Sequence, residues 1–391
     1  MQRIYLDHNA TTPVDPTVAD AMTAVLREEF GNPSSVHHFG QRAKAAIDQA
    51  RTAVGLLIGA DPSEVVFMSC GTESDNLAIR GAAEALDRTG RRHLITTTIE
   101  HEAVLNTVKA LGKRGWTTTL LPVDATGIVS AAVLRDALTD ETAVVSVMHA
   151  NNEIGTIQPI EELARLAHER GALFHADAVQ SAGKIAVDIR RLGVDLLSIS
   201  AHKFYGPKGI GALWIRRGLR LNPILTGGKQ ERSRRAGTEN VAGIVGMGVA
   251  AGAARLKMND EAVRLSMLRD RLEEGILRTV PGTLINGERG SRVPNTTNIS
   301  FDRIEAESLL IALDLDGVAV STGSACSSGT LEPSHVLKAM GFSPHRAQNS
   351  IRFSLGAGNT ESDVDRVISI IRGVVEKLRS LTRTPVASGR G

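Results

Sequence analysis

The chain has 391 residues, of which 42% are hydrophobic and 23% are charged, as in soluble globular proteins and unlike disordered or fibrous chains. Its 45 basic and 43 acidic residues leave a net charge of only +2, so no concentrated basic surface for nucleic acid is expected. Two cysteines, Cys70 and Cys326, are too few and too far apart for a disulfide framework or a zinc ribbon. The start lacks a signal-like apolar segment and no run of about 18 uncharged apolar residues occurs, so we expect a cytoplasmic protein without a membrane span.

Short apolar or β-branched runs alternate with helical patterns between about residues 64 and 217. This alternation predicts a mostly parallel sheet with helices on both faces. One helix is expected at 160–171, where Leu163, Leu166 and Ala167 share a face. The predicted strands are 64–70, 93–100, 117–123, 143–150, 173–179, 196–202 and 211–217.

An alanine- and glycine-rich stretch at 241–256 predicts a long buried helix, and after it the regular alternation of predicted strands and helices changes. We therefore expect a second, smaller α+β domain from residue 257 onward, after a large α/β domain that ends at 256. The tail at 383–391 has no apolar face and is expected to be disordered. The second domain should contain strands at 295–301 and 350–356 and helices at 307–317 and 361–381.

A lysine follows one of the predicted strands directly, in the sequence SAHKFYGPKG (200–209). A charged amine at the mouth of a buried strand is costly unless it is paired or used. Lys203 is therefore a candidate Schiff-base lysine, although a solvated lysine that opens a loop is the plain alternative. The Schiff-base hypothesis requires companions elsewhere in the chain.

The first companion is Asp177, in the strand FHADAVQ (174–180). Beside a pyridine ring, its carboxylate would keep the ring nitrogen protonated; at about 4 Å and an effective dielectric near 20 this pair is worth about 4 kcal/mol. Such a pairing makes pyridoxal phosphate an electron sink. Gln180 could donate to the phenolate oxygen of the ring. Taken alone, Asp177 also fits a satisfied buried acid or a cap.

Further polar residues follow other predicted strands. Gly71 and Thr72 turn into a helix whose first N–H groups suit a phosphate. Ser200 and His202 could complete that phosphate site from the neighbouring strand end. His101 opens another helix and could stack on the cofactor ring or carry protons.

Two residues in the second part of the chain also carry possible chemistry. Cys326 lies in STGSACSSGT (321–330), where an exposed thiol is a candidate nucleophile, although an inert loop thiol fits as well. Arg352 is flanked by Ile351 and Phe353, which suggests a buried fork for a carboxylate. The alternative is an arginine whose stem packs on the surface while its head lies in water.

Together, these segments resemble the cysteine desulfurases of the NifS/IscS type, which are fold-type I pyridoxal phosphate enzymes with the class V aminotransferase fold. The resemblance runs from about residue 3 to residue 380, and SAHKFYGPKG together with GSAC is its specific part. The segments are YLDHNATTP (5–13), GNPSSVHHFG (31–40), SCGTESDN (69–76), EHEAVL (100–105), NNEIGTIQP (151–159), HADAVQ (175–180), SAHKFYGPKGIGAL (200–213), RAGTEN (235–240), GSACSSG (323–329) and IRFSLG (351–356).

This resemblance implies how a pyridoxal phosphate cofactor would be held. Lys203 would bind it as a Schiff base, Asp177 would face the pyridine nitrogen, Gln180 the ring oxygen, and His101 would stack on the ring. The residues implied at the phosphate are Gly71, Thr72, Ser200, His202 and, from the partner subunit of a homodimer, Thr238.

The resemblance also implies the reaction. Asn152 and Arg352 would bind the carboxylate of L-cysteine, and Cys326 would take its sulfur as a persulfide, leaving L-alanine. An iron–sulfur scaffold or another sulfur acceptor, such as one serving tRNA thiolation, would then receive the sulfur. No metal site is implied, except that Cys326 could transiently hold a cluster. Residues 1–12 would join residues 257–382 in the small domain, leaving 13–256 as the large one.

Two other functions remain open on the sequence. Another class V transaminase or lyase, for example a selenocysteine lyase, would share Lys203 and Asp177 but would not need Cys326. A protein that serves mainly as a sulfur-relay scaffold would need no catalytic set, and the full set of lysine, aspartate and arginine argues against it.

Overall fold

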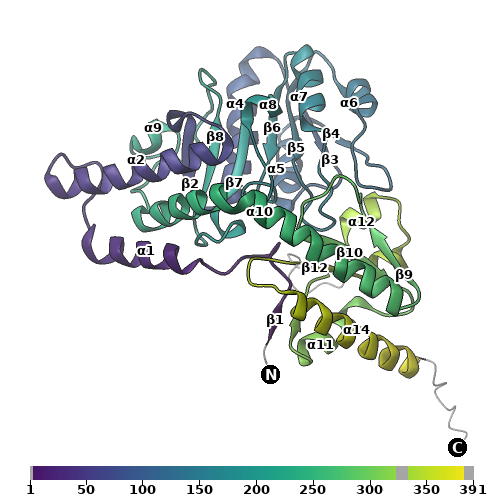
Figure 1. Ribbon diagram of the computed structural model, residues 1–391. Coiled ribbons are helices and arrows are strands. Elements are labelled where there is room, and N and C mark those ends of the chain that lie inside the picture. Colours follow the sequence, from purple (N-terminus) through teal and green to yellow (C-terminus); the bar gives the residue numbers. More distant parts are fainter. Residues whose placement is uncertain (1–2, 323–332, 383–391) are drawn as a thin grey trace, which may run out of the picture.

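The computed structural model in Figure 1 describes residues 3–322 and 333–382. Its main sheet has seven strands in the order β2-β8-β7-β6-β5-β3-β4. Only β8 runs against the others, since it is antiparallel to both of its neighbours. The predicted mostly parallel sheet is thus confirmed. Its strands are β2 (Val65–Met68), β3 (His93–Thr97), β4 (Thr117–Leu121), β5 (Thr142–Met148), β6 (Leu173–Asp177), β7 (Leu196–Ser200) and β8 (Gly211–Ile215).

Helices cover both faces of this sheet, and this explains the pattern of apolar and polar residues in its strands. Every residue of β2, β3, β5, β7 and β8 is buried, so most of their residues are apolar and exposed positions do not alternate with buried ones. The edge strand β4 instead exposes most of its residues. The covering helices are α1 (Pro16–Glu28), α2 (His38–Ile58), α3 (Gly71–Asn76), α4 (Ala82–Leu86), α5 (Glu102–Gly112), α6 (Ala131–Ala137), α7 (Ile160–Glu169), α8 (Ile189–Leu192) and α10 (Val241–Thr279), with the short α9 (Gln230–Ser233) nearby.

A smaller unit is built from the two ends of the chain. Its antiparallel sheet has the order β12-β10-β9, and β1 (Ile4–Tyr5), near the start of the chain, pairs in parallel with β11 (Val318–Ala319). A separate apolar cluster fills this unit, with Phe301 and Phe353 at its centre. The remaining elements are β9 (Thr283–Asn286), β10 (Thr296–Phe301), α11 (Ala306–Leu315), α12 (His335–Ala339), α13 (Pro344–Gln348), β12 (Ser350–Ser354) and α14 (Glu361–Thr382).

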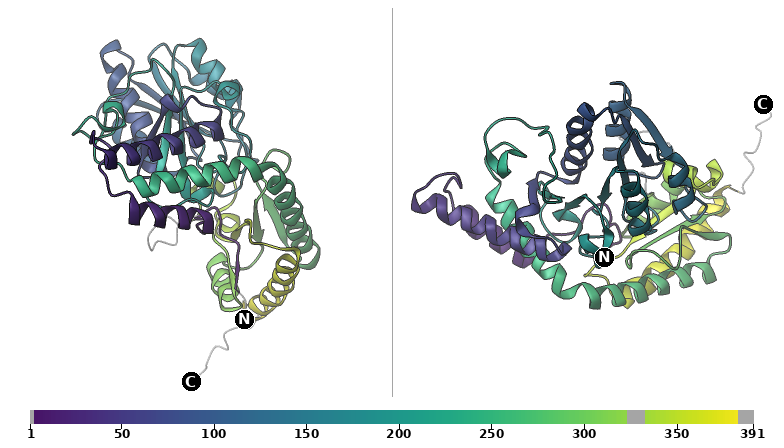
Figure 2. Two further views of the ribbon diagram at one scale, coloured as in Figure 1. Left: turned by 60° about the vertical axis from the view of Figure 1, so that its left-hand side comes forward. Right: turned by 90° about the horizontal axis from the view of Figure 1, so that it is seen from above.

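One helix joins the two units. α10 has 39 residues, and its first half packs on α1 and α2 while its second half packs on α14 (Figures 1 and 2). The expectation of a helix that ends near residue 256 was wrong, because Leu265, Leu268, Leu272 and Ile276 continue its buried stripe into the smaller unit. The predicted boundary between residues 256 and 257 therefore falls inside a continuous helix.

The same helix is long and apolar enough to cross a membrane by length and composition. Its apolar side chains instead pack inside the protein, since residues such as Met247 and Ala251 lie in the core beneath the large sheet. We therefore describe α10 as a core helix.

Candidate active site

The carboxyl ends of the parallel strands lie at one edge of the large sheet. β5 ends at Met148, β6 at Asp177 and β7 at Ser200, and these strands pair side by side. Ligands of open α/β sheets bind outside this edge. The strand order explains why residues far apart in the sequence gather there.

Asp177, His101 and Lys203 are the titratable residues at the centre of the site. The backbone N–H of Val179 donates to Asp177 Oδ1 at 2.9 Å, and burial raises the pKa of this carboxyl while the charges of His101 and Lys203 oppose that rise. His101 begins α5, and its Nδ1 accepts from the Ala103 N–H at 3.1 Å, so the proton of the neutral ring is on Nε2. Burial lowers the pKa of His101, and Asp177 acts against that change.

Lys203 lies at the end of the 3₁₀ turn that follows β7. Its Nζ donates to the backbone carbonyls of Asn9 at 2.6 Å and Ala10 at 2.8 Å. The side-chain amide of Gln180 donates to the same Asn9 carbonyl at 2.9 Å. The segment after β1 therefore forms one wall of the site, next to the lysine.

Asn9 connects three of the candidate residues, Lys203, Gln180 and Asn152. Its Nδ2 donates to the Asn152 carbonyl at 3.1 Å and to Thr296 Oγ1 at 2.8 Å, while its Oδ1 accepts from Lys184 Nζ at 2.8 Å. Lys184 Nζ also donates to Gln180 Oε1 at 2.7 Å. Every polar group of the Asn9 side chain is thus bonded, and its position is fixed from several sides.

The residues predicted at the phosphate face one another. A Cβ built on Gly71 would lie 2.9 Å from Val179 Cγ2 and 3.6 Å from the Cβ of Ser200, so only glycine allows this close approach. The hydroxyl of Ser200 is buried and has no hydrogen-bond partner among the described residues. The unpartnered Ser200 hydroxyl thus lies beside Gly71, the first residue of α3, where no side chain covers the backbone N–H groups. This arrangement fits a ligand with acceptor oxygens, such as a phosphate.

His202 and Thr72 lie at the border of this cradle. His202 Nδ1 contacts Thr11 Oγ1 at 3.2 Å, and burial lowers the pKa of the imidazole to about 4. Thr72 is exposed in the first turn of α3. The neutral His202 ring can donate one hydrogen bond to an anion without carrying a charge.

Arg352 and Asn152 meet on the smaller-unit side of the site. Arg352 lies in β12 and is only 3% exposed. It donates to Asp7 Oδ1 at 2.6 Å and to the Asn152 carbonyl at 3.0 Å, and its buried Nε has no partner among the described residues. This free N–H is suited to an oxygen of a substrate carboxylate.

Buried acids lie behind Asp177. Glu100 is fully buried and accepts from Thr97 Oγ1 and the Met148 N–H, and its burial raises the pKa to about 8. Asp75 of α3 is also buried, which raises the pKa of its carboxyl, and the negative charge of Asp177 adds to that rise. Burial thus favours the protonated form of both acids, which limits the negative charge that faces the ionised form of Asp177.

The structure does not test two of the predicted residues as members of this group. Cys326 lies outside the described residues. Thr238 is exposed on the segment between α9 and α10, and its contribution to a partner subunit's site stays a prediction.

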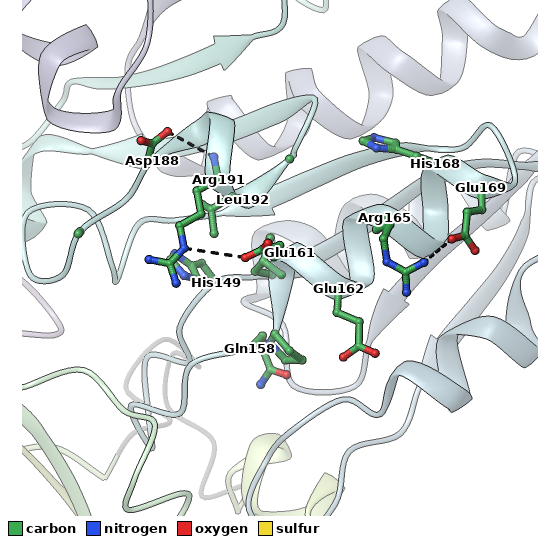
Figure 3. Close-up of a pocket in the computed structure, with 14 residues that line it drawn as sticks. His149, Gln158, Glu161, Glu162, Arg165, His168, Glu169, Asp188, Arg191 and Leu192 are labelled. Atoms are coloured by element: carbon green, nitrogen blue, oxygen red, sulfur yellow. Dashed lines mark hydrogen bonds and ion pairs between the residues drawn. The ribbon is translucent and has the colours of Figure 1, made fainter.

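A broad groove of about 1010 Å³ lies elsewhere, over α7 and α8 (Figure 3). Its charged side chains pair with each other, as in the contact of Arg191 with Glu161 at 3.9 Å and the i,i+4 pair of Arg165 and Glu169. None of the predicted site residues that the structure describes lines this groove, so we do not assign the active site to it.

Sequence reasoning missed Lys184, Asn9 and Asp7. Asn9 and Asp7 fall in YLDHNATTP, a segment that carries the family resemblance but whose individual residues receive no role from the sequence. Lys184 lies four residues after Gln180, and that spacing on a turn is the one signal that could have found it.

The sequence profile of the class V aminotransferase family, described as "Aminotransferase class-V", matches residues 4–367. The chain belongs to this family. Within it, several similar relatives are named cysteine desulfurase. The cysteine desulfurase IscS of Dictyoglomus turgidum is 50% identical over 381 residues, which cover 97% of this chain and 96% of that protein. The cysteine desulfurase NifS of Azotobacter vinelandii is 48% identical, and the match covers 100% of this chain and 96% of that protein.

Solved structures agree with the sequence comparison. A NifS-like protein superposes with a TM-score of 0.91 at 40% identity, covering 96% of this chain and 100% of that one. A structure of SspA in complex with cysteine has a TM-score of 0.79 at 35% identity, covering 90% of this chain and 98% of that one. The predicted family and fold class are confirmed.

Proposed function

We propose that this protein is a pyridoxal-phosphate-dependent cysteine desulfurase, which takes sulfur from L-cysteine and leaves L-alanine. The observation that carries the proposal is the joint placement of Asp177, His101 and Lys203 at the carboxyl edge of the sheet. It is supported by the name cysteine desulfurase, which relatives about half identical over nearly the whole chain bear.

The residues present fit the cofactor. Lys203 supplies the amine for its aldehyde, Asp177 the negative charge for its ring nitrogen, and Ser200 a buried hydroxyl without a partner among the described residues. Gly71, Thr72 and His202 would border the phosphate, His101 and Gln180 would border the ring, and Thr238 is assigned to the partner's site. When bound, pyridoxal phosphate supplies an electron sink for bonds at the substrate's α-carbon.

The remaining chemistry belongs to the chain. Arg352 and Asn152 orient the substrate carboxylate, with the free Nε of Arg352 as its donor. The Lys203 amine takes the α-proton and returns it, as a general base and acid. The thiolate of Cys326 attacks the substrate sulfur: a sulfur–sulfur bond forms, the carbon–sulfur bond breaks, and the carbon keeps the bonding pair and takes a proton.

Further parts of the proposal concern the surroundings of the enzyme. We assign it a homodimeric state, a cytoplasmic location and a protein acceptor for the persulfide sulfur, such as an iron–sulfur scaffold. The large and small domains are assigned as 13–256 and as 1–12 with 257–382, joined through the continuous helix α10.

Intact-mass analysis after incubation with L-cysteine tests the proposal. We expect the protein to gain the mass of one sulfur atom, to map it to Cys326, and to release alanine. Cys326→Ala should keep the visible absorbance of the cofactor, but it should no longer gain the mass of a sulfur atom or release sulfide from L-cysteine. Cys70→Ala, the matched change at the other cysteine, should still gain the sulfur atom and release sulfide.

The same measurements separate the alternatives. Unchanged sulfide release by Cys326→Ala would favour another class V lyase, such as one that acts on selenocysteine. Purified protein without any absorbance from a bound cofactor would favour a sulfur-relay scaffold.

A further inference from the structure

Next to the candidate Schiff-base lysine, the site contains a second lysine that the proposed chemistry does not use. Lys184 follows the turn after β6, and its Nζ donates to Asn9 Oδ1 and Gln180 Oε1 at 2.8 and 2.7 Å. Both contacts are neutral amide oxygens, which satisfy an ammonium group without neutralising its charge. Lys184 and Lys203 line the same small cavity of about 190 Å³.

The backbone holds the two lysines together. Gly183 has a φ of +78°, and a Cβ there would lie 2.6 Å from the Cβ of Phe204. The turn that carries Lys184 is thus packed directly on the residue that follows Lys203. Both Nζ atoms then bond to one residue, since Lys203 reaches the Asn9 carbonyl and Lys184 reaches its side chain.

The contacts of Lys184 also fix the orientation of Gln180. Lys184 Nζ donates to the Gln180 amide oxygen, and a protonated Lys184, which has only donors, allows no other orientation of that amide. The amide nitrogen is therefore turned to the Asn9 carbonyl, beside the Lys203 amine. Without Lys184, the Gln180 amide would lose the contact that distinguishes its two ends.

Like charges near Lys184 disfavour its own protonation. Burial lowers the pKa of Lys184 well below its usual range, and the charges of Lys203 and Arg352 act in the same direction. The two acids on the cavity rim are already engaged, since Asp15 caps α1 through Thr17 and Glu261 pairs with Arg264. Among the described residues, the titratable or charged groups around Lys184 are Lys203, Arg352, His8, His202, Asp15, Tyr205, Lys257 and Glu261.

We propose that Lys184 is a positioning residue for Lys203: it fixes Asn9 and Gln180 beside the Lys203 amine, and in its protonated form it opposes a second positive charge on that nitrogen. The inference rests on the proposed cofactor role of Lys203. It explains how an amine that must react in its neutral form is kept from holding a proton in a polar, half-buried site.

The first test is a pH titration of the visible absorbance of the bound cofactor in the purified holoenzyme. Lys184→Met should raise the midpoint by about one pH unit or more, the size of shift that one nearby charge produces. Lys184→Arg keeps the charge and should retain the original midpoint. Lys257→Met, the same change on the exposed rim of the cavity, is the matched control and should also leave it in place.

The second test needs no cofactor. Apoprotein is labelled with a small amine-reactive reagent over a range of pH, and modification of Lys203 is followed by peptide mass. The labelling midpoint should rise in Lys184→Met and in the second neutral variant, Lys184→Gln. An unchanged midpoint in these variants overturns the inference even where sulfur is released normally, and a raised midpoint supports it even where no sulfur is released.

Discussion

A carboxylate at the end of a buried strand is stable only if something compensates for its lost water. Asp177 is 6% exposed, and burial is the largest influence on the pKa of its carboxyl. The Val179 N–H and the charges of His101 and Lys203 compensate in part. A protonated ring nitrogen would complete this compensation, which is why we assign Asp177 the electronic role in the site.

Asp177→Asn tests that role. The substitution keeps the shape of the side chain and removes a charge pair worth about 4 kcal/mol, so kcat/KM for L-cysteine should fall by about a thousandfold. The cofactor should still bind, because Lys203 and the phosphate cradle are unchanged. Steady-state kinetics with the absorbance spectrum measure both effects. Asp188→Asn, at the cap of α8, should leave kcat/KM as it was; a small effect of Asp177→Asn would refute the assignment.

Glu100 makes a prediction about stability and pH. Its carboxyl has a pKa of about 8 when folded and 4.5 in the reference state, so the native state binds more protons between these values. The contribution is complete below about pH 4.5 and is lost as the pH rises toward 8, a change on the order of 4 kcal/mol. Glu100→Gln should flatten this dependence.

Urea unfolding at pH 5 and pH 8 measures the effect of Glu100. The exposed neighbour Glu102, changed to Gln in the same way, serves as the control and should leave the pH dependence intact. If the free energy of unfolding changed equally between pH 5 and pH 8 in the Glu100→Gln variant and in the unchanged protein, the prediction would be contradicted.

At the scale of elements, helix α10 was only half visible in the sequence. Its first half is an alanine- and glycine-rich run and is easily recognised, but the second half is polar on its outer face. The buried residues Leu265, Leu268, Leu272 and Ile276 recur there at three- and four-residue spacing. The change in composition at residue 257 reflects a change of partner, from α1 and α2 to α14, and not an end of the helix.

Two glycines of α10 predict opposite effects of one substitution. A Cβ at Gly248 would lie 2.6 Å from the Cα of Ala50 in α2, whereas a Cβ at Gly252 would meet nothing within 4 Å. Gly248→Ala should therefore destabilise the protein by about 1–3 kcal/mol through overpacking. Gly252→Ala should stabilise it by about 0.5–1 kcal/mol, because alanine favours the helix. Thermal unfolding of both variants measures this; shifts of the same sign would refute the close contact of α10 and α2.

At the scale of the whole molecule, the site combines both units and the start of the chain. The strand-end residues Asp177 and Lys203 could be predicted from sequence, because each follows an apolar run that fixes its position. Asn9 and Lys184 could not be predicted, because their roles come from contacts between segments that lie far apart in the sequence, such as the bond between these two residues. The smaller unit also reaches into the site through Ser334, which donates to Glu153, and His335, which contacts the Glu100 carbonyl.

Arg352 shows how this assembly serves specificity. It comes from the smaller unit, contacts Asp7 near the start of the chain, and bonds to Asn152 of the large unit. Lysine keeps the charge but lacks the rigid planar fork that makes these two bonds from separate nitrogens and presents a third N–H to a carboxylate. Arg352→Lys should raise KM for L-cysteine by about 10- to 100-fold, the value of one charged hydrogen bond, with the cofactor spectrum unchanged.

The control for Arg352→Lys is Arg271→Lys, because Arg271 pairs with Asp365 and Glu361 on the exposed surface of α10 and α14. Exposed pairs of this kind contribute less than about 1 kcal/mol, so KM should not change there. If KM rose equally in both variants, the effect would come from loosened packing of the smaller unit. A rise confined to Arg352→Lys places the substrate carboxylate where the two units and the start of the chain meet.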